Sequence, residues 1–316
     1  MVDLAVDLDG LSLCSPIMPA SGCFAIEYAE ALDFNQLGAL VIKSVSPRSR
    51  PGNPTPRVAE TAAGMLNSIG IPSKGLDYFL DHVLPPYLQF RTPVVVSVSA
   101  DTVGEFAQAA ARLSVAGVAA IEANISCPNL EADGLAFAMD PEATCAAMRA
   151  VKSETMLPVW AKLTPNVSHV AEIACAAESG GANALVMGNT VLGMAIDVHT
   201  RKPRLGNVMG GLSGPAIKPI AVRMVYQCHR SVSIPIIGCG GIACAEDVVE
   251  FMLAGASAVQ VGAASFQDPG IMQKITDDLV RFCDETGVQS VSGLTGALAL
   301  DADLTDSWLR MAQQSG

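Results

Sequence analysis

A short motif recurs at the start of hydrophobic runs along the chain. A glycine, one or two small residues and then a continuous apolar segment occur at residues 38–42, 117–121, 181–186 and 255–259. Glycine can adopt the left-handed conformation that ends many helices. A run without polar alternation is typical of a parallel strand that is covered on both faces. The motif therefore predicts repeated helix-to-strand units.

Helical patterns precede three of these glycines. The clearest predicts a helix that Ser168 caps and that ends at Gly180. Its buried stripe is expected to comprise Val170, Ile173, Ala174 and Ala177. These patterns indicate that helices alternate with the buried strands.

Further apolar runs complete a set of eight expected strands. They span residues 16–20, 40–43, 94–98, 120–124, 159–163, 184–187, 235–238 and 258–261. Eight strands that alternate with helices predict a (β/α)8 TIM barrel. A doubly wound sheet is the alternative, but the even spacing favours closure. Because no linker interrupts the pattern, residues 1–316 are expected to form a single domain.

The N-terminal segment has the pattern of a β-hairpin. Residues 4–8 and 11–13 are separated by Asp9 and Gly10, a pair that favours a type I′ turn. We expect this hairpin to plug the floor of the barrel.

The composition excludes several classes of protein. Half of the residues are hydrophobic and 16% are charged, which excludes an intrinsically disordered chain. The net charge of −12, with no block of lysine and arginine, argues against a nucleic-acid binder. The longest uncharged stretch, residues 179–196, is broken by glycine and asparagine and predicts no membrane span. Nine cysteines without a CxxC pair predict no metal centre and fit reduced thiols in the cytoplasm.

Polar and small residues follow the predicted strands at their C-terminal ends. In a TIM barrel these ends carry the active site. The residues there are Ser21, Lys43, Ser97, Asn124, Cys127, Lys162, Asn189, Thr190, Gly240, Gly241 and Gly262. Such a set is difficult to explain as core packing.

Paired glycines and two lysines suggest an anionic ligand. The loops at Gly240-Gly241 and Gly262 follow the last two strands, where barrels often bind phosphate through backbone N–H groups. The turns alone could also require these glycines. Lys43 and Lys162 each end a buried strand, and two such cations facing one cavity would be costly without anionic partners.

The most informative segment runs from Asn124 through Ser126 and Cys127 to Asn129. Primary amides donate and accept hydrogen bonds at once, so several of them suit a cyclic imide or amide. Cys127 could instead be a buried structural thiol. A further amide, Asn67, lies in a loop bounded by glycines at residues 64–70.

These motifs resemble those of the class 1 dihydroorotate dehydrogenases of de novo pyrimidine biosynthesis. The resemblance runs over nearly the whole chain and is carried by residues 19–24, 42–44, 52–61, 64–70, 124–129 and 211–219. The Asn-Pro-Thr-Pro-Arg run at 53–57 and the Gly-Gly-Leu-Ser-Gly-Pro-Ala run at 210–216 are most similar to the NAD-linked B type.

The resemblance implies an FMN-dependent oxidation of (S)-dihydroorotate to orotate. Cys127 would be the base that removes the C5 proton, while a hydride passes from C6 to the flavin. The residues implied to hold FMN are Ser21, Lys43, Ser44, Ser97, Asn124, Lys162, Gly188, Gly214, Gly240, Gly241, Gly262 and Ala263. Those implied to hold the substrate are Lys43, Asn67, Ser68, Ile69, Gly70, Ile71, Asn124, Asn129, Asn189 and Thr190.

Two positions depart from the B-type pattern. Ser97 stands where an asparagine is usual, and Gly188 replaces a larger aliphatic residue beside the flavin. Residues 71–78 are also similar to those of the homodimeric, fumarate-linked type.

The B-type resemblance further implies a homodimeric core and, with a second kind of subunit, a heterotetramer. The second subunit would carry FAD and a [2Fe–2S] cluster and pass electrons to NAD. Other functions stay open at this point: a flavin barrel acting on another dihydropyrimidine, a flavin-free phosphate-binding isomerase or lyase, and a non-catalytic binding barrel.

Overall fold

The computed structural model describes residues 2–126 and 136–301, and an eight-stranded parallel sheet forms its centre. The sheet order is β3-β18-β17-β12-β11-β10-β9-β4. Its strands are β3 (Ile17–Pro19), β4 (Leu40–Val45), β9 (Val94–Val98), β10 (Val118–Asn124), β11 (Val159–Lys162), β12 (Ala184–Met187), β17 (Ile236–Cys239) and β18 (Ala258–Val261). All eight predicted strands are confirmed, with ends that differ by two residues or fewer.

The sheet curves until its first and last strands are neighbours, which confirms the TIM barrel. The N–H of Gly38, just before β4, donates to the carbonyl oxygen of Ile17 in β3 at 2.9 Å. A Cβ on Gly38 would lie 2.1 Å from the carbonyl oxygen of Ser15, so only glycine allows this approach. The prediction of a left-handed glycine is confirmed at Gly117, Gly181 and Gly255 but is wrong at Gly38, where close backbone contact is the reason for glycine.

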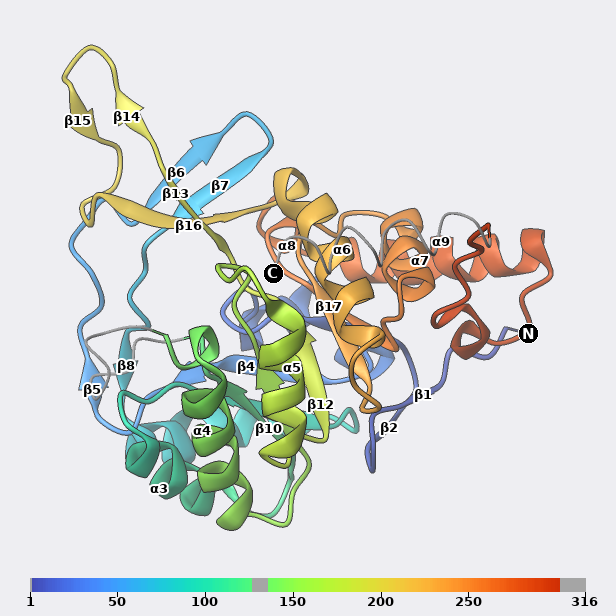
Figure 1. The fold of residues 1–316 in the computed structure, drawn as a ribbon, viewed down its shortest axis with the longest axis horizontal. Helices are drawn as coiled ribbons and strands as arrows, with labels where there is room; N and C mark the ends of the chain where they lie inside the picture. The colour runs from blue at the N-terminus through green and yellow to red at the C-terminus, as the bar shows by residue number, and fades with distance from the viewer. Residues whose placement is uncertain (1, 127–135, 302–316) are drawn as a thin grey trace.

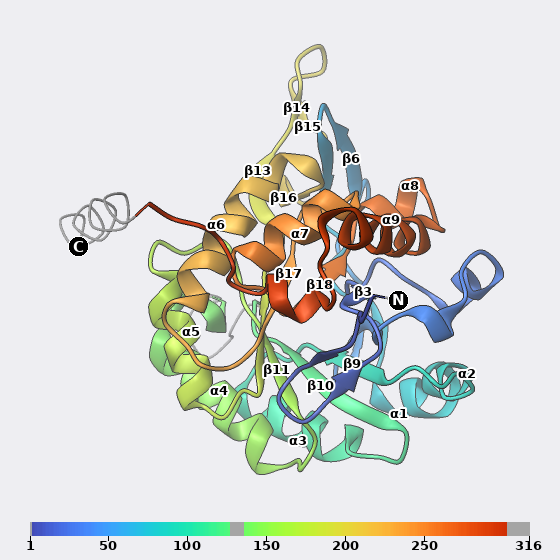
Figure 2. The same cartoon turned by 90° about the vertical axis from the view of Figure 1, so that its right-hand side faces the viewer.

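Helices surround the barrel, as Figure 2 shows. They are α1 (Leu76–Tyr78), α2 (Leu84–Tyr87), α3 (Val103–Leu113), α4 (Pro141–Ser153), α5 (Val170–Ser179), α6 (Lys218–His229), α7 (Ala245–Leu253), α8 (Ala264–Gln267) and α9 (Ile271–Thr286). The segment Phe79–Val83 between α1 and α2 is a π-helix. Short 3₁₀ turns span Ile26–Glu30, Phe34–Gln36, Phe137–Met139, Pro215–Ile217 and Val291–Leu294.

Helix α5 illustrates how the sequence pattern becomes packing. Its four predicted stripe residues are all buried against the barrel. The predicted cap is wrong, because the N-cap position is His169 and its side chain makes no capping hydrogen bond. Ser168 lies one residue too early to cap the first turn.

The N-terminal hairpin is formed by β1 (Val6–Asp7) and β2 (Ser12–Leu13). Asp9 and Gly10 both have positive φ, 50° and 96°, as a type I′ turn requires. The side-chain amide of Asn183, just before β12, donates to the Asp9 carboxylate at 2.8 Å. The hairpin is therefore confirmed, and its role as a plug of the barrel floor stays a prediction.

A second, antiparallel sheet stands away from the barrel (Figure 1). Its order is β13-β16-β7-β6, built from β6 (Val58–Thr61), β7 (Gly64–Asn67), β13 (Val191–Met194) and β16 (Met209–Ser213). Two small pairs accompany it: β14 (Ile196–Asp197) with β15 (Lys202–Pro203), and β5 (Ser49–Arg50) with β8 (Ser73–Lys74). The sequence patterns did not predict these short strands, of which β7, β13 and β16 contain glycine. Among the described residues no helix is long and apolar enough to cross a membrane.

Candidate active site

A cavity of about 750 Å³ opens at the C-terminal ends of the barrel strands. Asn124 and Lys162 are the last residues of β10 and β11, and both line it. The other predicted site residues in its wall are Ser21, Lys43, Ser44, Asn67, Ile69, Gly70, Ile71, Gly188, Asn189, Thr190, Gly214, Gly240, Gly241, Gly262 and Ala263. One cavity of ligand size thus collects most of the candidate residues.

Two of the described candidates, Ser97 and Ser68, are not in the cavity wall. Two further candidates, Cys127 and Asn129, lie outside the described residues. Ser97 is fully buried in β9, and its hydroxyl is 2.8 Å from that of Ser44. Ser68 accepts a hydrogen bond from the side chain of Asn53 at 2.8 Å. Ser97 and Ser68 therefore support neighbouring residues, and the assignment of either to a ligand stays a prediction.

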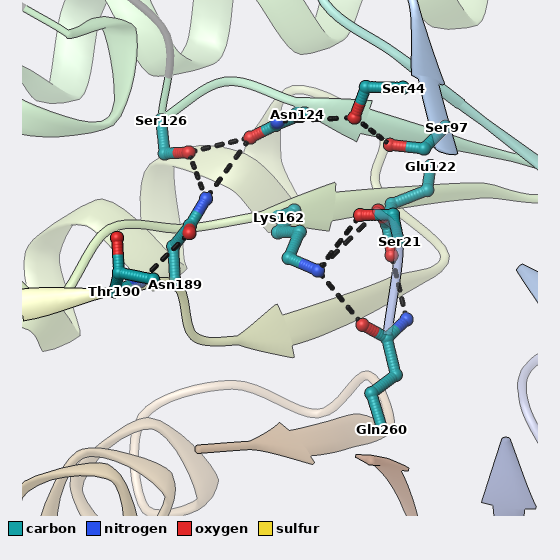
Figure 3. A network of polar contacts seen from close by, with 10 residues as sticks. All are labelled: Ser21, Ser44, Ser97, Glu122, Asn124, Ser126, Lys162, Asn189, Thr190 and Gln260. Carbon is teal, nitrogen blue, oxygen red and sulfur yellow. Dashed lines mark hydrogen bonds and ion pairs between the residues drawn. The ribbon is translucent and has the colours of Figure 1, made fainter. Parts of the chain in front are cut away.

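Amide and hydroxyl groups form one connected network at the cavity wall (Figure 3). The Ser126 hydroxyl donates to Asn124 Oδ1 at 2.6 Å, and Asn189 Nδ2 donates to Ser126 Oγ at 2.6 Å. Asn124 Nδ2 reaches Ser44 Oγ at 3.4 Å, and the Thr190 N–H donates to Asn189 Oδ1 at 2.8 Å. These bonds fix the orientation of the amides, as recognition of a polar ring requires.

Asn166 is a supporting residue that the sequence analysis missed. Its side-chain amide donates to the carbonyl oxygen of Thr190 at 3.2 Å, and its Oδ1 accepts from the N–H of Leu192 at 2.8 Å. Asn166 thereby joins the loop after β11 to the start of β13. No motif distinguishes it in the sequence, because its role depends on a contact between separate loops.

Lys162 already has a buried anionic partner. Its Nζ donates to Gln260 Oε1 at 2.9 Å and lies 3.7 Å from Glu122 Oε1. Burial is the largest single effect on the pKa of Lys162 and lowers it, but the Glu122 carboxylate, with smaller contributions from Cys239 and Cys23, raises the pKa above its ordinary value. The anionic partner expected for Lys162 is therefore supplied by the protein itself, and its contact with a ligand stays a prediction. The sequence signal for this partner was the carboxylate of Glu122 within the otherwise largely apolar run 120–124.

Lys43 is the cation that remains for a ligand. It ends the regular part of β4, is exposed to the cavity, and has no hydrogen bond or ion pair within residues 2–126 and 136–301. Partial burial lowers its pKa, and the nearby positive charge of Arg57 lowers it further. An anionic group in the cavity would relieve both effects.

The glycine loops meet closely at one side of the cavity. Gly214 and Gly241 have φ of 97° and 77°. A Cβ on Gly241 would lie 2.8 Å from the carbonyl oxygen of Gly214 and 3.0 Å from the backbone nitrogen of Lys218. Backbone geometry alone thus requires glycine here. The same geometry leaves the cavity wall without side chains, as a backbone phosphate site needs.

Comparison with known proteins gives a consistent result. A family model described as dihydroorotate dehydrogenase matches residues 3–283. A protein of Listeria monocytogenes serotype 4a (strain HCC23) is 50% identical over 294 residues, 92% of this chain and 97% of the relative. One of Anoxybacillus flavithermus (strain DSM 21510 / WK1) is 51% identical over 296 residues, 93% of this chain and 95% of the relative. Both are named "Dihydroorotate dehydrogenase B (NAD(+)), catalytic subunit".

Proposed function

The chain belongs to the dihydroorotate dehydrogenase family, and we propose that it oxidises (S)-dihydroorotate to orotate with FMN as its resident cofactor. The observation that carries the proposal is the cavity. Its wall combines a cation, Lys43, without a partner among the described residues, fixed amides and bare glycine loops at the catalytic end of a TIM barrel.

The donor set in the cavity suits FMN. Lys162 and the Asn124 amide can meet the polar edge of the flavin ring, and Gly241 and Gly262 leave backbone N–H groups free to approach a phosphate. Ser21, Ser44, Gly188, Gly214, Gly240 and Ala263 would complete the cofactor site. Ser97 would act by holding Ser44.

The substrate would lie beside the amides. Asn67, Asn124 and Asn189 can read the ring amides, and the free cation of Lys43 can pair with the carboxylate. Thr190 and the backbone from Ile69 to Ile71 would close the same side of the cavity, with Ser68 and Asn129 as further contacts.

Cys127 would be the general base. It directly follows Ser126, a residue of the cavity wall. A free cysteine titrates near pH 8.5, so a modest change in environment yields a thiolate able to accept the C5 proton near neutral pH. FMN supplies the two-electron acceptor for the hydride from C6. Loss of that proton and hydride leaves the C5–C6 double bond of orotate.

The electrons would pass to NAD through a second subunit. The two relatives described above are named as catalytic subunits of an NAD(+) enzyme. We propose a homodimer of this chain joined by a subunit that carries FAD and a [2Fe–2S] cluster.

The test is to follow dihydroorotate oxidation by the purified chain with a dye, with NAD and with fumarate. The same assays are repeated with the co-expressed partner. We expect dye reduction by the chain alone and NAD reduction only with the partner. Rapid turnover with fumarate and no partner would contradict the NAD link. Oxidation of a different dihydropyrimidine in preference to dihydroorotate would contradict the proposed substrate.

A further inference from the structure

Three side chains beneath the cavity form a closed polar cluster. Gln260 Nε2 donates to Glu122 Oε2 at 2.7 Å, while Gln260 Oε1 accepts from Lys162 Nζ at 2.9 Å. Lys162 also donates to Ser21 Oγ at 3.2 Å. Figure 3 shows that the cluster joins three different barrel strands.

Only one end of this cluster reaches the cavity. Lys162 and Ser21 line the cavity wall, whereas Glu122 and Gln260 are fully buried behind them. Glu122 cannot touch a ligand in the cavity without a rearrangement of Lys162. The contact that links Glu122 to a ligand in the cavity is therefore that lysine.

Burying these polar side chains costs free energy, which argues that the cluster has a functional role. A fully buried carboxylate loses its hydration, and Glu122 Oε1 has no hydrogen-bond partner among the described residues. The Gln260 amide can satisfy a charged carboxylate on one side and a charged ammonium on the other only in its present orientation. The cluster is thus complementary to an ionised Glu122 and a protonated Lys162.

We propose that Glu122, acting through Gln260, is the positioning residue that keeps Lys162 protonated and directed into the cavity toward the polar N1/C2 edge of the flavin ring. This inference rests on the proposed function, because the flavin is the group that Lys162 would meet. Without Glu122, burial would favour a neutral lysine and remove the fixed cation.

The other titratable groups around Lys162 do not replace the carboxylate. They are Cys23 and Cys239, which also line the cavity. Burial raises the pKa of Cys23 to about 12, and it also raises the pKa of Cys239. Both are neutral thiols at neutral pH. Glu122 is therefore the anion that compensates Lys162 under working conditions.

The first test measures Lys162 directly in the flavin-free chain. The titration is followed by NMR of ¹³C-labelled lysine side chains, with the Lys162 signal identified by its loss in Lys162→Met. Glu122→Gln keeps an oxygen acceptor for Gln260 but removes the charge. We expect the Lys162 midpoint to fall by at least about 1 pH unit, because burial is no longer opposed. Asp278→Asn, which removes an exposed carboxylate paired with Arg281, should leave it unchanged.

The second test asks whether Glu122 acts through Lys162. The FMN reduction potential is measured against pH in both single variants and in the Glu122→Gln/Lys162→Met double variant. We expect Glu122→Gln to add an inflection at the lowered Lys162 midpoint. The double variant should match Lys162→Met. If Glu122→Gln fails to fold, the comparison uses Glu122→Asp and the double variant. Glu122→Asp is expected to keep the wild-type Lys162 midpoint and FMN potential.

The outcomes separate this inference from the proposed function. An unchanged Lys162 midpoint in Glu122→Gln, or a double variant whose potential differs from that of Lys162→Met, would overturn the role of Glu122. A wild-type chain that binds no FMN would instead contradict the proposed function, while the NMR titration would still measure the link between Glu122 and Lys162.

Discussion

Lys43 and Lys162 line the same cavity but differ in what surrounds them. Lys162 is buried with Glu122 and Gln260, whereas Lys43 has no partner in the described part of the chain. The strand ends alone could not distinguish the two lysines, because the partners of Lys162 come from strands distant in the sequence. The cavity therefore has one compensated cation and one cation free for a ligand.

Lys43 is expected to make substrate binding depend on pH. Its pKa is lowered from the ordinary 10.5, and the ammonium binds the dihydroorotate carboxylate only below that pKa. KM should therefore rise as the pH increases through the lowered value. Lys43→Met, assayed at saturating FMN, should raise KM about 10- to 100-fold and give a flat profile, since a charged hydrogen bond contributes about 1.5–3 kcal/mol.

The control for Lys43 is Lys274→Met, which removes an exposed lysine from α9 and leaves the cavity intact. Its KM should equal that of the wild type at each pH. A KM for Lys43→Met within twofold of wild type would show that the carboxylate binds elsewhere.

Cys127 is expected to be essential for the chemistry and dispensable for the cofactor. Cys127→Ala should lower kcat by about 10²–10⁴-fold, the usual contribution of a general base, with FMN still bound. Cys127→Ser should retain activity that grows with pH, because a hydroxyl is a weaker base. Steady-state kinetics and flavin absorbance measure both effects.

The control for Cys127 is Cys175→Ala, at an exposed thiol on α5, which should leave kcat and FMN binding unchanged. Near-normal turnover in Cys127→Ala would assign the base to another group.

At the scale of the elements, the barrel strands were predictable and the antiparallel sheet was not. Strands such as β9 (Val94–Val98) are continuous apolar runs, so local pattern is sufficient to identify them. Strands β7 and β16 contain glycine and pair across a long sequence separation, Leu66 with Leu212. These strands form only through that long-range pairing, which no local sequence pattern indicates.

The residues of the candidate site also divide into those that the sequence predicts and those that it does not. Asn124 and Lys162 lie at the ends of predicted strands and Gly240 just after one, so the rule that barrels place chemistry at strand ends was enough to find them. Gln260 lies inside a strand and Asn166 inside a loop, and both act through contacts that only the folded chain brings together.

The glycine loops are expected to tolerate no side chain at Gly241. Its φ is 77° and a Cβ would lie 2.8 Å from the carbonyl oxygen of Gly214. Gly241→Ala should cost about 1–3 kcal/mol in unfolding free energy and weaken FMN binding. Denaturant unfolding and flavin titration measure both effects.

Gly104→Ala is the matched control for the glycine loops, since nothing lies within 4 Å of its Cβ position in α3. It should be neutral or slightly stabilising. A Gly241→Ala protein as stable as the control and with unchanged FMN affinity would contradict the close backbone approach as the reason for glycine.

At the scale of the whole molecule, one cavity draws its wall from most of the barrel. Ser21, Asn124 and Gly262 come from the loops or ends of three separate strands, and Asn67 comes from the antiparallel sheet. Cofactor binding should therefore stabilise the chain as one unit. Calorimetry should show a single transition for residues 1–316, stabilised by about 2.7 kcal/mol when free FMN is 100 times its Kd. Two separate transitions would contradict the single domain.

The most direct test of the central claim is an anaerobic half-reaction. The purified chain, loaded with FMN and free of any acceptor, is mixed with a small excess of dihydroorotate, and the visible flavin absorbance and the orotate formed are recorded. We expect the flavin to bleach, with about one orotate formed per FMN, because the chain should complete proton and hydride removal without its partner. A chain that binds FMN but leaves it oxidised, or forms no orotate as it bleaches, would contradict the account.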